Sequence, residues 1–337
     1  MPAAPLDRRQ RPLADLRVSL TDRCNFRCGY CMPADAFPAG HRFLAARELL
    51  SAAEVGRLVE AARRAGVRKV RLTGGEPLLR ADVLDVVARV AATGVDDIAM
   101  TTNGSLLGRV AGRLAGAGLH RLTVSLDSLD AATVSRLSGG RATLSSILAG
   151  IEAAEAAGFA PLKLNCVVRR GVNEDDILPL ADFARSRGHV MRFIEYMDVG
   201  SSNRWRLDEV VPGADVLARI AEVHPVEAAP PSYAGEVAQR FRYRDGAGEV
   251  GVIASVTQPF CGNCTRLRVS ADGTLYTCLF STSGTPLGGL LREGSDAELD
   301  VALARVWRGR DDAYSEQRAA RDPASTLARV EMSYIGG

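Results

Sequence analysis

Six of the seven cysteines in this chain form two triplets near its opposite ends: Cys24, Cys28 and Cys31, and then Cys261, Cys264 and Cys278. A [4Fe–4S] cluster is normally held by four thiolates, so three thiolates leave one iron open to a ligand from outside the protein. Structural metal sites have a complete set of protein ligands, whereas catalytic sites keep an open position. The two triplets therefore predict two open metal centres.

Iron–sulfur clusters fit both triplets better than zinc does, because structural zinc takes four protein ligands and every histidine lies outside the triplets. The close, uneven spacing C-x3-C-x2-C of the first triplet is typical of one loop wrapped around a cluster. The second triplet is a C-x2-C pair followed, after thirteen residues, by a third cysteine. Structural zinc remains an alternative there, and disulfides are less favoured for both. The histidines are His41, His120, His189 and His224.

The start of the chain shows no export signal. It lacks an apolar segment and carries the charged residues Asp7, Arg8, Arg9, Arg11, Asp15 and Arg17. No later run of roughly eighteen apolar residues predicts a membrane span. We therefore expect a cytoplasmic protein, where thiols stay reduced. The net charge of +2 predicts no nucleic-acid surface.

Short β-rich runs alternate with longer amphipathic segments, which is typical of βα units around a parallel sheet. The pattern predicts an α/β fold, an incomplete (βα)6 TIM-like barrel with its loops and chemistry at the carboxyl ends of the strands. The first triplet follows the first strand directly. Strands are expected at residues 16–21, 67–73, 98–102, 122–127, 162–168 and 191–196, and helices at 51–65, 82–92, 106–117, 144–157 and 174–187.

The βα rhythm stops at the run Ala-Ala-Pro-Pro-Ser, residues 228–232. Short β-like segments follow, with one late helix expected at residues 297–307. We therefore predict a barrel region over residues 1–230, which holds the first cluster, and a smaller cluster-binding region over residues 231–337.

Alternation along the strands predicts a basic interior. Lys69, Arg71 and Thr73 share one face of their strand, whereas Val70 and Leu72 lie on the other. Buried charges are costly unless something negative pairs with them. A nucleoside triphosphate would supply that charge, and salt bridges to barrel acids such as Glu76 or Asp127 are the alternative. The same alternation puts Lys163 and Asn165 inside with Arg17, and Leu162, Leu164 and Cys166 outside.

Two motifs carry a resemblance to a known superfamily. The loop CNFRCGYC at residues 24–31 resembles the cluster loop of radical S-adenosylmethionine (SAM) enzymes, and GGEP at residues 74–77 resembles their methionine-binding turn. The second triplet, Arg266 and Arg268 beside it, and the terminal MSYIGG are similar to the GTP 3′,8-cyclase family. This resemblance implies two [4Fe–4S] clusters, SAM, and cyclisation of GTP to (8S)-3′,8-cyclo-7,8-dihydroguanosine 5′-triphosphate, the first step of molybdenum cofactor biosynthesis.

The resemblance also implies roles for individual residues. All six triplet cysteines would be metal ligands, and Gly336 and Gly337 would enter the active site. Arg17, Arg266 and Arg268 would be catalytic. SAM would contact Tyr30, Gly75, Ser125 and Met197, although without the resemblance Ser125 reads as a plain strand residue and Met197 as core. GTP would contact Arg17, Lys69, Arg71, Thr102, Lys163, Arg266, Leu267 and Arg268, with Arg192 assisting.

Two other functions remain open on the sequence alone: a peptide-modifying radical SAM enzyme with an auxiliary cluster, and a non-catalytic electron-transfer protein. The second would need neither the GGEP turn nor open irons. The expected partners are GTP as substrate, an electron donor that the sequence does not identify, cyclic pyranopterin monophosphate synthase downstream, and a second copy of the chain in a homodimer.

Overall fold

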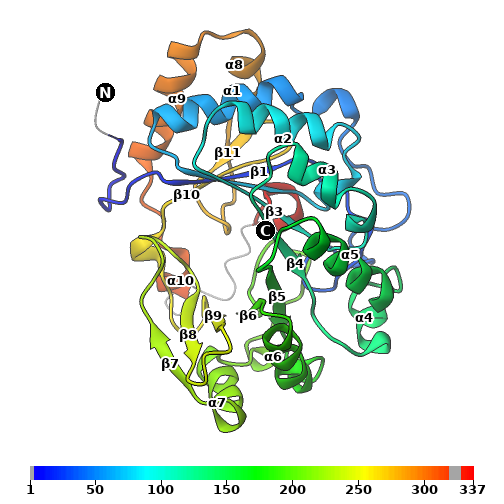
Figure 1. Cartoon of the computed structure of the whole chain (residues 1–337). Helices are drawn as coiled ribbons and strands as arrows, with labels where there is room; N and C mark the ends of the chain where they lie inside the picture. The colour runs from blue at the N-terminus through cyan, green and yellow to red at the C-terminus, as the bar shows by residue number, and fades with distance from the viewer. Residues whose placement is uncertain (1–3, 319–327) are drawn as a thin grey trace.

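Six parallel strands, each beside the next, form the centre of this computed structural model, which describes residues 4–318 and 328–337. They are β1 (Asp15–Ser19), β2 (Lys69–Thr73), β3 (Asp97–Thr102), β4 (Arg121–Ser125), β5 (Lys163–Val168) and β6 (Val190–Glu195). Figure 1 shows helices lying along the outer side of these strands. The predicted incomplete barrel is confirmed.

Helices follow the strands where the sequence periodicity placed them. α1 begins with the predicted capping box, in which Ser51 Oγ accepts from the Glu54 amide at 3.2 Å and the Glu54 carboxylate accepts from the Ser51 amide at 2.6 Å. The helix expected at residues 106–117 is instead a 3₁₀ turn, Leu107–Arg109, and a short α3, separated by Val110, whose backbone (φ −133°, ψ −9°) is not helical. The helices are α1 (Ala52–Arg64), α2 (Val83–Ala92), α3 (Ala111–Gly116), α4 (Ala131–Leu137), α5 (Leu144–Ala156), α6 (Ile177–Ser186), α7 (Gly213–Val223), α8 (Gly288–Glu293), α9 (Asp296–Gly309), α10 (Tyr314–Gln317) and α11 (Met332–Ile335).

Strands from the last third of the chain extend the sheet at both ends. β9 (Glu249–Ile253) runs parallel to β6, and β10 (Arg266–Val269) runs parallel to β1. Antiparallel strands continue outward: β7 (Val226–Ala229) and β8 (Gln239–Tyr243) beyond β9, and β11 (Thr274–Tyr276) and β12 (Thr285–Pro286) beyond β10. The predicted boundary at 228–232 begins inside β7 and ends before β8, and these two strands pair with each other. The two-region division therefore remains a prediction, since strands on both sides share one sheet.

The hydrophobic core lies between the strands and the surrounding helices. Val70, Leu72 and Leu164 have no exposed surface, as strand alternation predicted. Cys166 belongs to the same core and accepts a hydrogen bond from Asn173 at 3.5 Å, so its interpretation as a buried small side chain is confirmed. No described helix is long and apolar enough to cross a membrane.

Candidate active site

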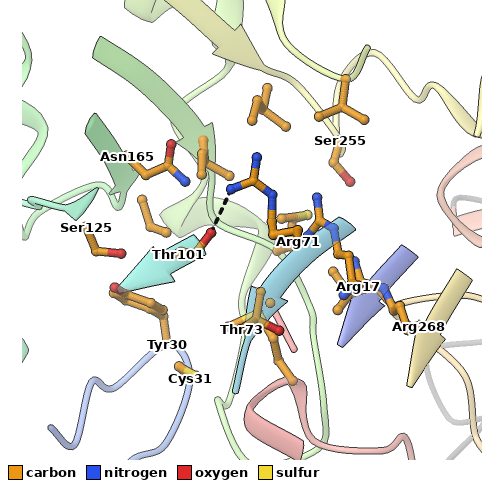
Figure 2. Close-up of a pocket in the computed structure, with 18 of the residues that line it drawn as sticks. Arg17, Tyr30, Cys31, Arg71, Thr73, Thr101, Ser125, Asn165, Ser255 and Arg268 are labelled. Atoms are coloured by element: carbon orange, nitrogen blue, oxygen red, sulfur yellow. Dashed lines mark hydrogen bonds between the residues drawn. The ribbon is translucent and has the colours of Figure 1, made fainter. Parts of the chain in front are cut away.

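Both cysteine triplets line one cavity of about 310 Å³ inside the barrel. Figure 2 shows Arg17, Arg71 and Arg268 reaching into this space from neighbouring strands, with Tyr30 and Cys31 at its border. Residues 24–31 come from the loop after β1, and residues 261–278 lie around β10, the neighbour of β1. The pairing of β10 with β1 therefore joins the two ends of the sequence in one site.

Backbone hydrogen bonds hold the first cysteine loop in shape. The Arg27 guanidinium is buried and donates to the carbonyls of Cys24, Phe26 and Phe37. The GGEP turn packs directly against this loop, because the amide of Gly75 donates to the Thr21 carbonyl at 2.7 Å. A Cβ on Gly75 would lie 2.3 Å from the Arg23 carbonyl oxygen, so only glycine allows this approach. The two radical SAM motifs thus form one wall of the cavity.

The thiols of the first triplet are held in their neutral form unless a cation binds them. Burial raises the pKa of Cys24 to about 11 and raises the pKa of Cys28 and Cys31 further. Metal ligation requires the thiolate. Buried thiols that converge on a cavity therefore suit a positively charged group such as a cluster's iron.

Cys264 in the second triplet has different surroundings. Arg266 and Arg310 donate to its sulfur, at 3.3 and 3.1 Å. Burial acts to raise the pKa of Cys264, but these two guanidiniums lower it to about 6. At Cys278 burial outweighs the lowering effects of the Phe280 amide and Arg268, and its pKa rises to about 12. The second triplet therefore presents one thiolate that the protein itself stabilises.

In the described ranges, no three His, Cys, Asp or Glu side chains are grouped closely enough to share a single ion. Three thiolates on a [4Fe–4S] cluster bind three different irons, so they need no shared point of contact.

A group of buried arginines forms the wall between the triplets. Arg17 is aligned with Arg71 on one side and with Arg268 on the other, so the three side chains share a face. Burial lowers their pKa values, and Arg266 and Arg268 lower that of Arg17 further. Within the described part of the chain, the Nε atoms of Arg17 and Arg192 have no hydrogen-bond partner. Several positive charges close together in a partly buried wall are costly without a counter-charge, so this wall suits an anion.

Acidic side chains in the barrel leave most of this positive charge uncompensated. Glu76 accepts from Thr102 Oγ1 and from the Asn103 amide, both at 2.7 Å, and burial raises its pKa to about 7. Asp127 accepts from Tyr30 at 2.7 Å and from the Val167 amide, and burial raises its pKa to about 6. The predicted alternative, in which these two acids pair with the basic residues, is not what the structure shows.

The structure adds two residues that the sequence interpretation missed. Asp15 lies 3.6 Å from Lys69 Nζ on the adjacent strand, and Tyr233 accepts a hydrogen bond from that nitrogen at 2.6 Å. Strand alternation could have found Asp15, because it lies two residues before Arg17. Tyr233 comes from the loop between β7 and β8, and no local pattern points it at the barrel.

Thr102 lines the cavity with most of the predicted residues, whereas Leu267 and Lys163 do not. Thr102 bonds Glu76, whereas the preceding Thr101 accepts from Arg71 Nη1 at 2.9 Å, as the dashed line in Figure 2 marks. The side chain of Leu267 is fully buried in the hydrophobic core, so only its backbone could reach a ligand. Lys163 is half-buried but does not line the cavity.

The other predicted residues meet at the cavity: Arg17, Tyr30, Lys69, Arg71, Gly75, Ser125, Arg192, Met197, Arg266, Arg268 and all six triplet cysteines. The end of the chain lies there too. Gly337 lines the cavity, and the Gly336 carbonyl accepts from Arg268 Nη1. In Figure 1 the carboxyl terminus sits at the centre of the barrel.

Comparisons with known proteins agree with this geometry. Residues 18–184 match the radical SAM superfamily, and residues 189–316 match Molybdenum Cofactor Synthesis C. The chain is 54% identical over 352 residues to a GTP 3′,8-cyclase of Acidothermus cellulolyticus, with 97% of each chain covered. It is 52% identical over 338 residues to that of Xanthomonas axonopodis pv. citri, with 100% of each covered.

A solved structure shares the fold. The crystal structure of Streptococcus suis SuiB bound to S-adenosylmethionine superposes with a TM-score of 0.64 at 17% identity, covering 97% of this chain and 72% of that chain. SuiB shares the fold at low sequence identity, whereas the two cyclases are more than half identical to this chain over nearly their full length. The identity therefore assigns the family within this fold. The chain belongs to the GTP 3′,8-cyclase family of the radical SAM superfamily.

Proposed function

We propose that this chain converts GTP to (8S)-3′,8-cyclo-7,8-dihydroguanosine 5′-triphosphate, opening molybdenum cofactor biosynthesis. One observation carries the proposal: a cluster of arginines, with few acidic side chains among them, lines the same cavity as two open cysteine triplets. A triphosphate is the kind of ligand that compensates such a wall. Family membership supplies SAM and [4Fe–4S] clusters as the cofactors.

The cysteines fit this role. Cys24, Cys28 and Cys31 would hold the first cluster beside the GGEP turn, and Cys261, Cys264 and Cys278 the second, across the arginine wall. When bound, the first cluster and SAM together supply a 5′-deoxyadenosyl radical for hydrogen abstraction.

The residues of this chain position the reacting groups. Tyr30, Gly75, Ser125 and Met197 border the SAM side, where the Tyr30 ring is fixed by its bond to Asp127. Arg17, Arg71, Arg266 and Arg268 would bind the triphosphate, assisted by Lys69 and Arg192. The second cluster's loop would hold guanine so that C8 faces the ribose C3′. Positioning of this kind supplies much of the rate enhancement when a bond forms within one bound molecule.

The test is an anaerobic assay of reconstituted protein with reductant, SAM and GTP. 5′-Deoxyadenosine and the cyclised nucleotide are followed by mass spectrometry, and iron and sulfide are counted on the same sample. Both products with two full clusters are expected. Deoxyadenosine without a nucleotide product would refute GTP as the substrate, and zinc in place of iron would refute the radical chemistry.

Thr101 should affect GTP binding and Thr102 should not. Thr101→Val removes one bond to the Arg71 guanidinium while Thr123 still accepts from it at 3.1 Å. A hydrogen bond to a charged group contributes about 1.5 kcal/mol, so the KM for GTP should rise roughly tenfold with the SAM affinity unchanged. In Thr102→Val, Glu76 loses a donor beside the first cluster loop, so SAM binding should weaken instead. The reverse pattern would return the substrate contact to Thr102.

GTP binding should take up a proton above pH 7. Burial lowers the pKa of Lys69 to about 7, so at higher pH the free protein carries it neutral. A triphosphate favours the charged form, so affinity should fall by up to about tenfold per pH unit above 7. Calorimetry in buffers of different ionisation enthalpy measures how many protons the protein takes up when GTP binds.

Two variants control this measurement. Lys69→Met should lose the uptake near pH 7, while Lys163→Met should keep it, because burial lowers the pKa of Lys163 only to about 8. Binding at pH 8 without proton uptake would contradict the role of Lys69.

Location and partners are part of the proposal. We place the protein in the cytoplasm, with an external electron donor and cyclic pyranopterin monophosphate synthase as the next enzyme. A homodimer is the expected assembly.

A further inference from the structure

The amino-terminal arm, residues 4–12, has no role in the function described so far. Within it, Asp7 and Arg11 are both buried and form an ion pair, with Arg11 Nε 2.6 Å from Asp7 Oδ2. The amide of Arg8 donates to the carbonyl of Arg310 at 3.1 Å, and the Trp307 indole donates to the Arg11 carbonyl at 3.0 Å. The arm is therefore bonded to the end of α9.

Arg310 connects this arm to the second cysteine triplet. Its side chain is only 4% exposed. Nη1 donates to the carbonyl oxygen of Cys264 at 2.7 Å, and Nη2 donates to the sulfur of the same residue at 3.1 Å. The guanidinium thus binds Cys264 at two points.

Neighbouring groups fix the Arg310 guanidinium in this position. Asp312 accepts from its Nε at 3.1 Å, and Asp7 Oδ2 lies 3.7 Å from Nη1. The Cζ atom of Arg310 lies 4.6 Å from the ring centroid of Trp307, which is fully buried. Arg11 continues the arrangement by donating to the Cys261 carbonyl at 2.8 Å. The arm and α9 therefore form a rigid support under two of the three cysteines.

A hydrogen bond to a ligating sulfur withdraws electron density from the cluster and raises its reduction potential. Arg266 also donates to the Cys264 sulfur, but it faces the proposed substrate and would respond to GTP. Arg310 lines the same cavity, but its guanidinium is already paired with Asp312 and lies 3.7 Å from Asp7. We therefore expect its bond to Cys264 to depend less on substrate than that of Arg266.

We propose that Arg310, held by the amino-terminal arm, is a positioning residue that donates to the Cys264 thiolate and makes the second cluster easier to reduce. The inference rests on the proposed role of Cys264 as a ligand of that cluster. It concerns the potential of the cluster and is independent of which substrate the cavity takes.

The test is a redox titration of the second cluster alone, followed by electron paramagnetic resonance. The full chain with Cys24, Cys28 and Cys31 changed to serine serves as the parent, so that only the second triplet can hold iron. In this background Arg310→Gln should shift the midpoint potential to a more negative value. Arg308→Gln is the matched control, because Arg308 is exposed in the last turn of α9, two residues before Arg310, and the potential of this variant should equal that of the parent.

The outcomes test the role of Arg310 separately from the assignment of the second triplet as cluster ligands. An unchanged potential in Arg310→Gln, with the cluster intact, overturns the inference. A parent that binds no cluster refutes the ligand assignment instead. Arg310→Lys keeps the charge but cannot bind two atoms of Cys264 in the same fork, so its potential should also fall. If both variants lose iron while Arg308→Gln retains it, Arg310 holds the cluster rather than tuning it, and the potential-setting role is wrong.

Discussion

Cys28→Ser should abolish both 5′-deoxyadenosine and the cyclised nucleotide. Cys28 is one of three thiols with raised pKa at the first site, and a serine hydroxyl there would not supply the thiolate that a cluster requires. Loss of one ligand from a three-cysteine loop leaves too few to hold the cluster. Iron content should fall by about half, and anaerobic product analysis should find neither compound above background.

Cys261→Ser should separate the two products. The first triplet and the GGEP turn are untouched by this change, so SAM cleavage should continue at a reduced rate. Guanine would lose its proposed anchor at the second cluster, and misplacement by about 1 Å can cost roughly a hundredfold in rate. We therefore expect deoxyadenosine with at least about a hundredfold less cyclised nucleotide.

Cys166→Ala is the matched control for both changes, because Cys166 is a fully buried cysteine outside the cavity. It should keep both clusters and both products. Equal loss of deoxyadenosine in Cys28→Ser and Cys261→Ser would show that the triplets do not have separate roles.

Local periodicity predicted the barrel but could not predict how the ends of the chain meet. The strands β1 to β6 and the helix faces follow from alternation and capping, which are properties of neighbouring residues. The placement of β10 beside β1 depends on a pairing between residues about 250 positions apart, such as Asp15 with Arg266. No local pattern encodes that pairing. The sequence therefore showed two cysteine triplets, and the fold showed that they share a cavity.

For two predicted contacts, Thr102 and Leu267, strand alternation and the resemblance point to different side chains. The residue-level roles came from the resemblance, while strand alternation decides which side chains face inward. Arg71 pairs with Ala99 on the adjacent strand, and Thr101 lies two residues after Ala99 on the same face. The resemblance instead implied Thr102. For Leu267, alternation between Arg266 and Arg268 predicts the core side, where the structure places it. Both stay predicted contacts, since Thr102 lines the cavity and Leu267 could reach a ligand through its backbone.

Deletion of Gly336 and Gly337 should stop cyclisation while leaving the fold and both clusters intact. The preceding helix is anchored without them: Ile335 is fully buried, and Tyr334 donates to Asp272 at 2.7 Å. The two glycines instead reach the arginine wall, where the Gly336 carbonyl accepts from Arg268. Without that acceptor Arg268 loses its orientation toward the proposed substrate, so cyclised product should fall at least about a hundredfold.

Glycine itself is required at position 336, which gives a second and finer test. Gly336 has φ of +75°, and a Cβ there would lie 2.1 Å from Thr73 Oγ1. Gly336→Ala should therefore displace the tail and reduce cyclisation nearly as much as the deletion. Gly94→Ala imposes the same kind of strain at φ +69° in open space far from the cavity, and it should keep full activity. Parental turnover in the deletion variant would show that the tail is not needed for cyclisation. Loss of cyclisation in Gly336→Ala alone would instead point to a clash with Thr73 as the cause.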